Sequence, residues 1–106
     1  MLFHTGWSKH LGTETYFYFP YLSVEIVNSL LEKGITTILI DTLSVDPPGA
    51  ISFPAHKAIT TKNGIIGECF CNFDQLDFEN PLIIALPIKL EGLDASPVRA
   101  VAVEVE

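Results

Sequence analysis

The chain has 106 residues, of which 48% are hydrophobic and 18% are charged, and its thirteen acidic and six basic residues give a formal net charge of −7. This acidic balance excludes the basic surface that binding to nucleic acid or to an anionic membrane requires. No apolar run approaches the ~18 residues of a membrane-spanning helix, and the first residues lack the basic start of a signal peptide. We therefore expect a cytoplasmic protein.

The length predicts a single domain, residues 1–106, which buries roughly 60–70% of the surface that its unfolded chain exposes. The hydrophobic fraction is higher than a small monomer needs to fill its core. We therefore expect a homo-oligomer.

The first predicted element is a short strand at residues 2–4, which begins as though its sheet continued into sequence that is not present. Its edge is one that a second copy could cover. Residues 7–20 are predicted to be an irregular segment whose aromatic rings pack on the core. A platform for stacking nucleic-acid bases is the alternative, but basic residues are not interleaved with the rings.

The clearest helix is predicted at residues 23–33. Ser23 is a good N-cap and Gly34 is a typical stop, and the apolar stripe consists of Val24, Ile26, Val27, Leu30 and Leu31. Residues 36–40 follow as an apolar, β-branched run without alternation, which is typical of a strand covered on both faces. We expect this strand to be central in its sheet.

Polar side chains follow that strand in a loop rich in proline and glycine. Asp41, Ser44 and Asp46 occupy this loop, and ligands of α/β sheets bind beside the carboxyl ends of strands. The alternative, which the residue types favour, is that these side chains accept hydrogen bonds from loop amides in Asx-type turns.

Two residues further along point to a metal. His56 is predicted in the first turn of a helix that runs from Pro54 to about residue 64, where the positive end of the helix dipole favours a neutral imidazole. Glu68 is predicted in an apolar strand, where a carboxylate is costly unless it is paired or bound to a metal. A capping or core role for His56 is the alternative.

The rest of the chain is predicted to contain strands at residues 82–90 and 98–105, which complete an α/β domain with a mixed sheet. Cys69 and Cys71 are the only cysteines. We expect two buried thiols that act as small apolar side chains, because a disulfide across one intervening strand residue would be strained. Metal capture or redox chemistry is the remote alternative.

Several blocks of sequence together resemble one known family. These blocks are Thr-Gly-Trp at 5–7, Phe-Pro-Tyr-Leu-Ser at 19–23, Ile-Asp-Thr-Leu-Ser-Val-Asp at 40–46, Pro-Ala-His at 54–56, Glu-Cys-Phe-Cys-Asn at 68–72 and Gly-Leu-Asp-Ala-Ser-Pro-Val-Arg-Ala at 92–100. They resemble the cyclase family of metal-dependent hydrolases, which includes bacterial kynurenine formamidase. The resemblance is to the C-terminal half of such proteins, whose upstream half carries a His-x-Gly-Thr-His-x-Asp pattern that His4 and His10 do not match.

The resemblance implies a swivelling β/β/α-type domain with flanking helices, truncated on its N-terminal side. It implies that His56 and Glu68 are ligands of a divalent metal, zinc or manganese, that activates water against a formamide or cyclic amide carbonyl. Trp7 and Ser96 are candidates for the substrate pocket, with a structural role as the alternative for each.

Two functions follow from these observations. The first is a cyclase-like amidohydrolase component that needs further ligands, for example from a complementary N-terminal half, and shows no turnover alone. The second is a noncatalytic, shortened relative that acts as an oligomeric binding or structural module. A catalytic zinc site generally has three protein ligands, so the two ligands identified favour the second function for the isolated chain.

Overall fold

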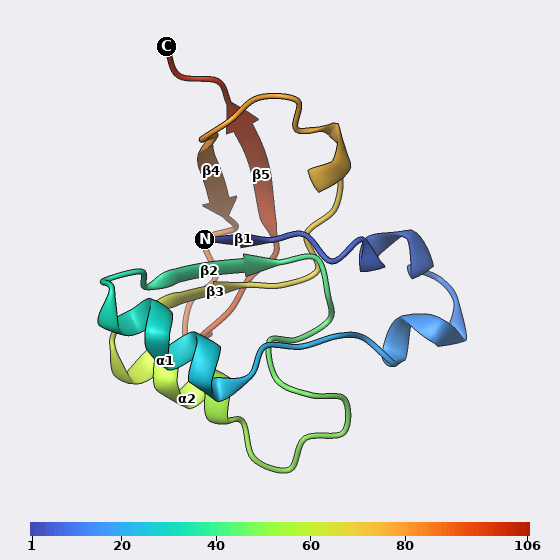
Figure 1. Ribbon diagram of the computed structural model, residues 1–106, viewed down its shortest axis with the longest axis vertical. Coiled ribbons are helices and arrows are strands. Elements are labelled where there is room, and N and C mark those ends of the chain that lie inside the picture. Colours follow the sequence, from blue (N-terminus) through green and yellow to red (C-terminus); the bar gives the residue numbers. More distant parts are fainter. The chain divides into compact units, whose positions relative to one another are not determined.

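The computed structural model describes residues 1–106, and a three-stranded parallel sheet organises the first part of the chain (Figure 1). Strands β1 (Leu2–Phe3), β2 (Thr37–Ile40) and β3 (Ile65–Gly67) lie in the order β1-β2-β3. Leu2 pairs with Leu39, and Ile38 pairs with Ile66. The expectation that β2 is the central strand is confirmed, and Ile38, Leu39 and Ile40 are all buried.

Helices α1 (Val24–Glu32) and α2 (Pro54–Thr61) connect these strands and lie side by side on one face of the sheet (Figure 1). Such crossovers are what successive parallel strands require. The core between helices and sheet consists of Leu22, Val27, Ile38, Ile40, Val45, Ala55 and Ile59. This packing fixes the carboxyl end of β2 relative to the first turn of α2.

The boundaries of α1 follow the local signals in the sequence. The Ser23 hydroxyl accepts a hydrogen bond from the Ile26 amide at 3.3 Å, and Gly34 has a φ of 78°, which terminates the helix in the left-handed conformation. Helix α2 ends at Thr61, before the predicted end near residue 64, and Asn63 has a positive φ of 53°. The expected helices are therefore present, with a shorter α2.

Residues 7–20 contain two short 3₁₀ helices, Trp7–His10 and Glu14–Phe17. Tyr16 and Phe19 are buried, whereas Phe17, Tyr18 and Tyr21 are exposed. The expectation that the aromatic rings of this segment pack on the core therefore holds for Tyr16 and Phe19 and fails for Phe17 and Tyr18.

The chain divides into two compact units, Met1–Asp74 and Gln75–Glu106. In the second unit, β4 (Leu82–Pro87) and β5 (Val98–Val103) form an antiparallel pair. Both strands are shorter than predicted, and the amide of Ile88 donates to the Pro97 carbonyl at 3.2 Å just beyond the ladder. The single domain spanning residues 1–106 stays a prediction.

The expected α/β class is confirmed, with both parallel and antiparallel strands and two α-helices. The parallel and antiparallel pairs occur in separate sheets. None of the helices has the length and apolar character needed to cross a membrane.

Candidate metal centre

Asp41 is the first polar residue after β2, and its carboxylate holds the segment that follows β1. Its oxygens accept hydrogen bonds from the Thr5 amide at 3.0 Å, the Thr5 hydroxyl at 2.6 Å and the Gly6 amide at 2.8 Å. Burial raises the pKa of Asp41, but these donors from Thr5 and Gly6 outweigh burial and hold the pKa below its ordinary value. The carboxylate therefore satisfies amides, as expected, although they belong to a distant segment and not to a local turn.

Asp46 reaches the start of α2 from the same loop. Its side chain is 1% exposed and accepts hydrogen bonds from the amides of Ala55 at 2.9 Å and His56 at 3.0 Å. These amides belong to the first turn of the helix, which has no acceptors of its own for them. Burial raises the pKa of Asp46, but the hydrogen bonds of His56 and Ala55 outweigh this effect and lower it.

The same carboxylate also orients the imidazole of His56. Oδ2 of Asp46 lies 2.7 Å from Nδ1 of His56, so the neutral ring has its proton on Nδ1 and its lone pair on Nε2. Nε2 in turn lies 3.2 Å from Oε1 of Glu68. The structure thus brings together the two residues that the sequence singled out.

Glu68 is held in place by the backbone of the β2 loop. Its Oε1 accepts a hydrogen bond from the Val45 amide at 2.9 Å, and its side chain is 28% exposed. The expectation that Glu68 lies within a strand is wrong, because β3 ends at Gly67. Val45 and Asp46 are adjacent, so a single loop positions both the carboxylate of Glu68 and the ring of His56.

The facing atoms of His56 and Glu68 fit a cation between them. A lone pair on Nε2 and a carboxylate oxygen repel each other at 3.2 Å unless a proton or a metal ion lies between them. Two donors that each lie about 2.1 Å from one ion are about 3.0–3.4 Å apart when the angle at the ion is between about 90° and 110°. The observed separation falls within this range.

No group of three or more His, Cys, Asp or Glu side chains in the structure is arranged to hold a metal ion. Asp46 does not add a ligand, because its Oδ2 is occupied by Nδ1 and the amide of His56. The structure therefore pairs His56 with Glu68, and the Asp46 carboxylate orients the histidine from its other ring nitrogen.

Comparison with known proteins finds sequences that are similar to this chain. Residues 1–47 match the Cyclase family model, described as "Putative cyclase". The chain is 38% identical over 77 residues to kynurenine formamidase from Bordetella pertussis and 39% identical over 75 residues to kynurenine formamidase from Delftia acidovorans. Over these residues the chain is similar to the cyclase family.

The similarity covers most of this chain but only part of each relative. The matched segment covers 73% of this chain and 36% of the Bordetella protein, and 71% of this chain and 35% of the Delftia protein. The kynurenine formamidase of Paracidovorax citrulli is 35% identical over 77 residues. The chain thus spans about a third of the length of the curated relatives that it matches.

The polar groups of the two substrate-pocket candidates already have hydrogen-bond partners within the chain. The indole N–H of Trp7 donates to the Tyr16 carbonyl at 3.1 Å, and the indole ring lies 4.6 Å from the His10 ring between centroids. The hydroxyl of Ser96 donates to the Pro97 carbonyl at 3.0 Å. Trp7 and Ser96 lie in different units, and a substrate role stays a prediction for each.

The expectation that the cysteines are buried is wrong, because Cys69 and Cys71 are both exposed free thiols. Cys69 lies outside β3 and has a positive φ of 58°. Its side chain therefore does not point into the core, as it could if the strand continued. Burial, together with the neighbouring Cys69 side chain, raises the pKa of Tyr16 to about 12, so the phenol stays neutral at physiological pH.

Asp46 is the site residue whose role the sequence analysis missed. We expected it to serve a local turn, but its partners are the amides and ring of a helix nine and ten residues further along the chain. An acidic residue before a helix whose first turn contains His was the available signal. This signal was weak, because the sequence of the loop between Asp46 and His56 does not predict that the loop folds back to bring the two residues together.

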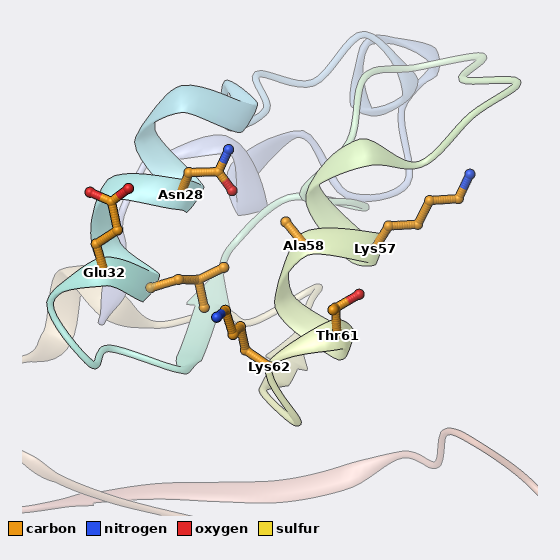
Figure 2. Close-up of a pocket in the computed structure, with 7 residues that line it drawn as sticks. Asn28, Glu32, Lys57, Ala58, Thr61 and Lys62 are labelled. Carbon is orange, nitrogen blue, oxygen red and sulfur yellow. The ribbon is translucent and has the colours of Figure 1, made fainter.

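A groove of about 470 Å³ lies elsewhere, between α1 and α2 (Figure 2). Asn28 and Glu32 on α1 line it opposite Ala58, Thr61 and Lys62. Neither His56 nor Glu68 is among its lining residues, so the groove is separate from the candidate metal centre.

Proposed function

We propose that this chain supplies part of the metal site of a cyclase-like amidohydrolase, with His56 and Glu68 as ligands of one divalent ion. The proposal includes zinc or manganese as the ion, and a formamide or cyclic amide as the substrate. Support for the reaction class comes from the kynurenine formamidases that the chain resembles. The swivelling β/β/α arrangement of such hydrolases is part of the same proposal.

The observation that carries the proposal is the 3.2 Å separation of His56 Nε2 from Glu68 Oε1, with Asp46 on the opposite ring nitrogen. Imidazole nitrogen and carboxylate oxygen are suitable donors for zinc and manganese. A metal bound there would supply a water of lowered pKa and polarise the substrate carbonyl.

Four residues of the chain have separate roles in this proposal. His56 presents Nε2, Asp46 holds the proton on Nδ1 and fixes the ring plane, and the Val45 amide fixes the carboxylate of Glu68. A carboxylate that accepts the proton of the nitrogen that does not bind the metal increases the basicity of a ligating imidazole. The remaining ligands and the acid–base group would come from a complementary polypeptide that corresponds to the rest of the relatives.

A noncatalytic role is the second candidate, and one observation favours it for the isolated chain. Only two metal donors converge, and no cluster of three or more is present, whereas catalytic zinc sites generally have three protein ligands. In this case the chain retains the fold of the family and binds a metal weakly or not at all.

Zinc titration of the purified chain, followed by calorimetry, tests the proposed ligands. We expect weak binding by the unmodified chain and a loss of roughly 100-fold or more in His56→Ala and Glu68→Gln. The Glu68→Gln variant keeps an oxygen for the Val45 amide. His4→Ala is the matched control, since His4 is exposed, and it should bind zinc as the unmodified chain does.

Formamidase assays separate the two candidate functions. We expect no turnover by the chain alone, and metal-dependent turnover when a polypeptide carrying the upstream half of a relative is added. Turnover that His56→Ala abolishes supports the amidohydrolase component. Zinc binding that is identical in the unmodified chain, His56→Ala and Glu68→Gln contradicts the proposed ligands.

A further inference from the structure

The hydrogen-bond ladder between β2 and β3 is interrupted just after Gly67. The Ile65 amide donates to the carbonyl that precedes β2 at 2.9 Å, and the pairing continues regularly to Gly67. Every second amide of β3 donates to every second carbonyl of β2, so the Cys69 amide should donate to Ile40 next. The Ile40 carbonyl accepts instead from the Phe70 amide at 3.1 Å. One extra residue is therefore inserted before Phe70, which is a β-bulge.

The bulge has an unusual backbone conformation at Cys69. Its φ is 58°, in a region that residues with a Cβ atom rarely adopt. Its amide donates to the Thr42 carbonyl at 2.8 Å. Left-handed backbone costs free energy at any residue except glycine, so other contacts must stabilise the bulge.

The ring of Phe70 folds back over Gly67 and supplies such a contact. A Cβ atom at Gly67 would lie 2.6 Å from Cε2 and 3.2 Å from Cζ of Phe70. It would also lie 2.5 Å from Cδ2 of Leu39. The ring therefore fills the space that a side chain at residue 67 would need, and only glycine permits this contact.

Phe70 and Glu68 are directed to opposite faces of the sheet. Gly67 pairs with Leu39, whose two neighbours in β2 belong to the core beneath the helices (Figure 1). Since strand residues alternate between faces, the ring over Gly67 lies on the face away from the helices. Glu68 reaches the helix side, where its Oε1 accepts from the Val45 amide at 2.9 Å.

We propose that Phe70 is a positioning residue for Glu68, and through Glu68 for the candidate metal centre. The ring over Gly67 holds the extra residue of the bulge in place, and the extra residue sets the path of the backbone that carries Glu68. Without the ring, the ladder can return to its regular register, and the Glu68 carboxylate then moves away from the Val45 amide. This inference rests on the proposed metal ligands, but the position of Glu68 is measurable without metal.

Amide hydrogen exchange of the metal-free chain, followed by NMR, tests whether Phe70 holds Glu68. We expect the Val45 amide to exchange about tenfold faster or more in Phe70→Ala, and the amides of α1 to change by a clearly smaller factor. A general loss of stability accelerates both by the same factor, so the comparison separates positioning from stability. Glu68→Ala gives the exchange rate of the Val45 amide without its acceptor.

Zinc affinity, measured by calorimetry, should fall about tenfold or more in Phe70→Ala. Equal acceleration of Val45 and of α1, or an unchanged Val45 rate, overturns the role of Phe70.

Two substitutions at Cys69 give a second result that does not depend on how Phe70→Ala folds. Glycine adopts a positive φ without strain, whereas a β-branched residue is a clear outlier there. We expect Cys69→Gly to keep the Val45 exchange rate and the zinc affinity of the unmodified chain. Cys69→Val should change both about tenfold. Both variants lack the thiol, so a difference between them reports on the backbone, and equal behaviour overturns the bulge as the device that positions Glu68.

Failure of this inference is distinguishable from failure of the proposed ligands. Absence of zinc binding by the unmodified chain contradicts the ligands, while the Val45 exchange rate still tests the position of Glu68. Zinc binding that needs His56 and Glu68 but is unchanged in Phe70→Ala supports the ligands and overturns the role of Phe70.

Discussion

Asp46 and His56 are joined by two hydrogen bonds, one from the amide of His56 at 3.0 Å and one with its Nδ1 at 2.7 Å. One carboxylate therefore begins helix α2 and orients the ring that the helix carries. The helix and the candidate ligand depend on the same buried group, so a change at Asp46 affects folding and metal binding together.

The first prediction concerns Asp46→Asn. An amide has one oxygen, so it cannot accept from Ala55 and from both groups of His56 in the way that the carboxylate does. We expect zinc affinity to fall about 10–100-fold, since the partner of a ligating histidine has effects of this size. We also expect a loss of about 1–3 kcal/mol in the free energy of unfolding.

Calorimetric zinc titration and urea unfolding measure these two effects. Asp77→Asn removes the same charge from an exposed position and should change neither quantity appreciably. Unchanged zinc affinity in Asp46→Asn would mean that the orientation of the His56 ring does not limit metal binding.

Asp41 gives the second prediction, the dependence of stability on pH. Its pKa is below the ordinary value in the folded chain because the donors of Thr5 and Gly6 outweigh burial, which raises it. A carboxyl group with a lowered folded pKa stabilises the fold at pH values above its unfolded pKa of about 3.9. This contribution is lost as the pH falls through the folded pKa.

We therefore expect Asp41→Asn to lower the free energy of unfolding at pH 7 by about 2–3 kcal/mol. Below about pH 4, the difference from the unmodified chain should shrink. Urea unfolding followed by circular dichroism at several pH values measures both. The acid dependence should weaken without vanishing, because Asp46 also has a lowered pKa. If Asp41→Asn keeps the full pH dependence of the free energy of unfolding, groups other than Asp41 are responsible for that dependence.

The elements that were correctly predicted are those with local signals. Ser23 and Gly34 mark the two ends of α1 by their own backbone and side-chain chemistry, and the apolar run of β2 requires cover on both faces wherever it lies. His56 was placed correctly in the first turn of α2 because Pro54 marks the start of that helix.

The features that the sequence did not predict depend on the direction that the backbone takes after a helix or strand ends. The backbone turns at Cys69, with a φ of 58°, and the Cys69 amide donates to the Thr42 carbonyl at 2.8 Å. No residue type in that stretch predicts such a turn, since left-handed backbone is uncommon at cysteine. Both the exposed thiols and the position of Glu68 outside β3 follow from it.

The third prediction concerns the reactivity of these thiols. Because Cys69 and Cys71 are both exposed, Ellman's reagent should modify two thiols in the native chain without denaturant. Replacing both cysteines with alanine should leave zinc affinity unchanged, since neither takes part in the contact between His56 and Glu68. Thiols that react only in urea would show that they are covered in solution, and lost zinc binding in the double variant would assign the metal to sulfur.

The fourth prediction tests the close packing around Gly64, between the end of α2 and the start of β3. A Cβ atom at Gly64 would lie 2.5 Å from the Thr36 carbonyl oxygen, 2.6 Å from Cγ2 of Ile59 and 2.9 Å from the Ile59 carbonyl oxygen. Two of these atoms belong to the backbone. The amide of Gly64 donates to the same Ile59 carbonyl at 2.9 Å, so the chain cannot move away without losing this hydrogen bond.

We expect Gly64→Ala to lower the free energy of unfolding by about 1–3 kcal/mol, the usual cost of forcing an extra methyl group into a packed site. Thermal or urea unfolding measures the loss, and Thr61→Ala, at an exposed position in the last turn of α2, is the control. Ile59 is fully buried in the core and lies on the helix that carries His56. Gly64→Ala should therefore also reduce zinc affinity. An unchanged zinc affinity would show that Asp46 holds the first turn of α2 in place even when the last turn of the helix is disturbed.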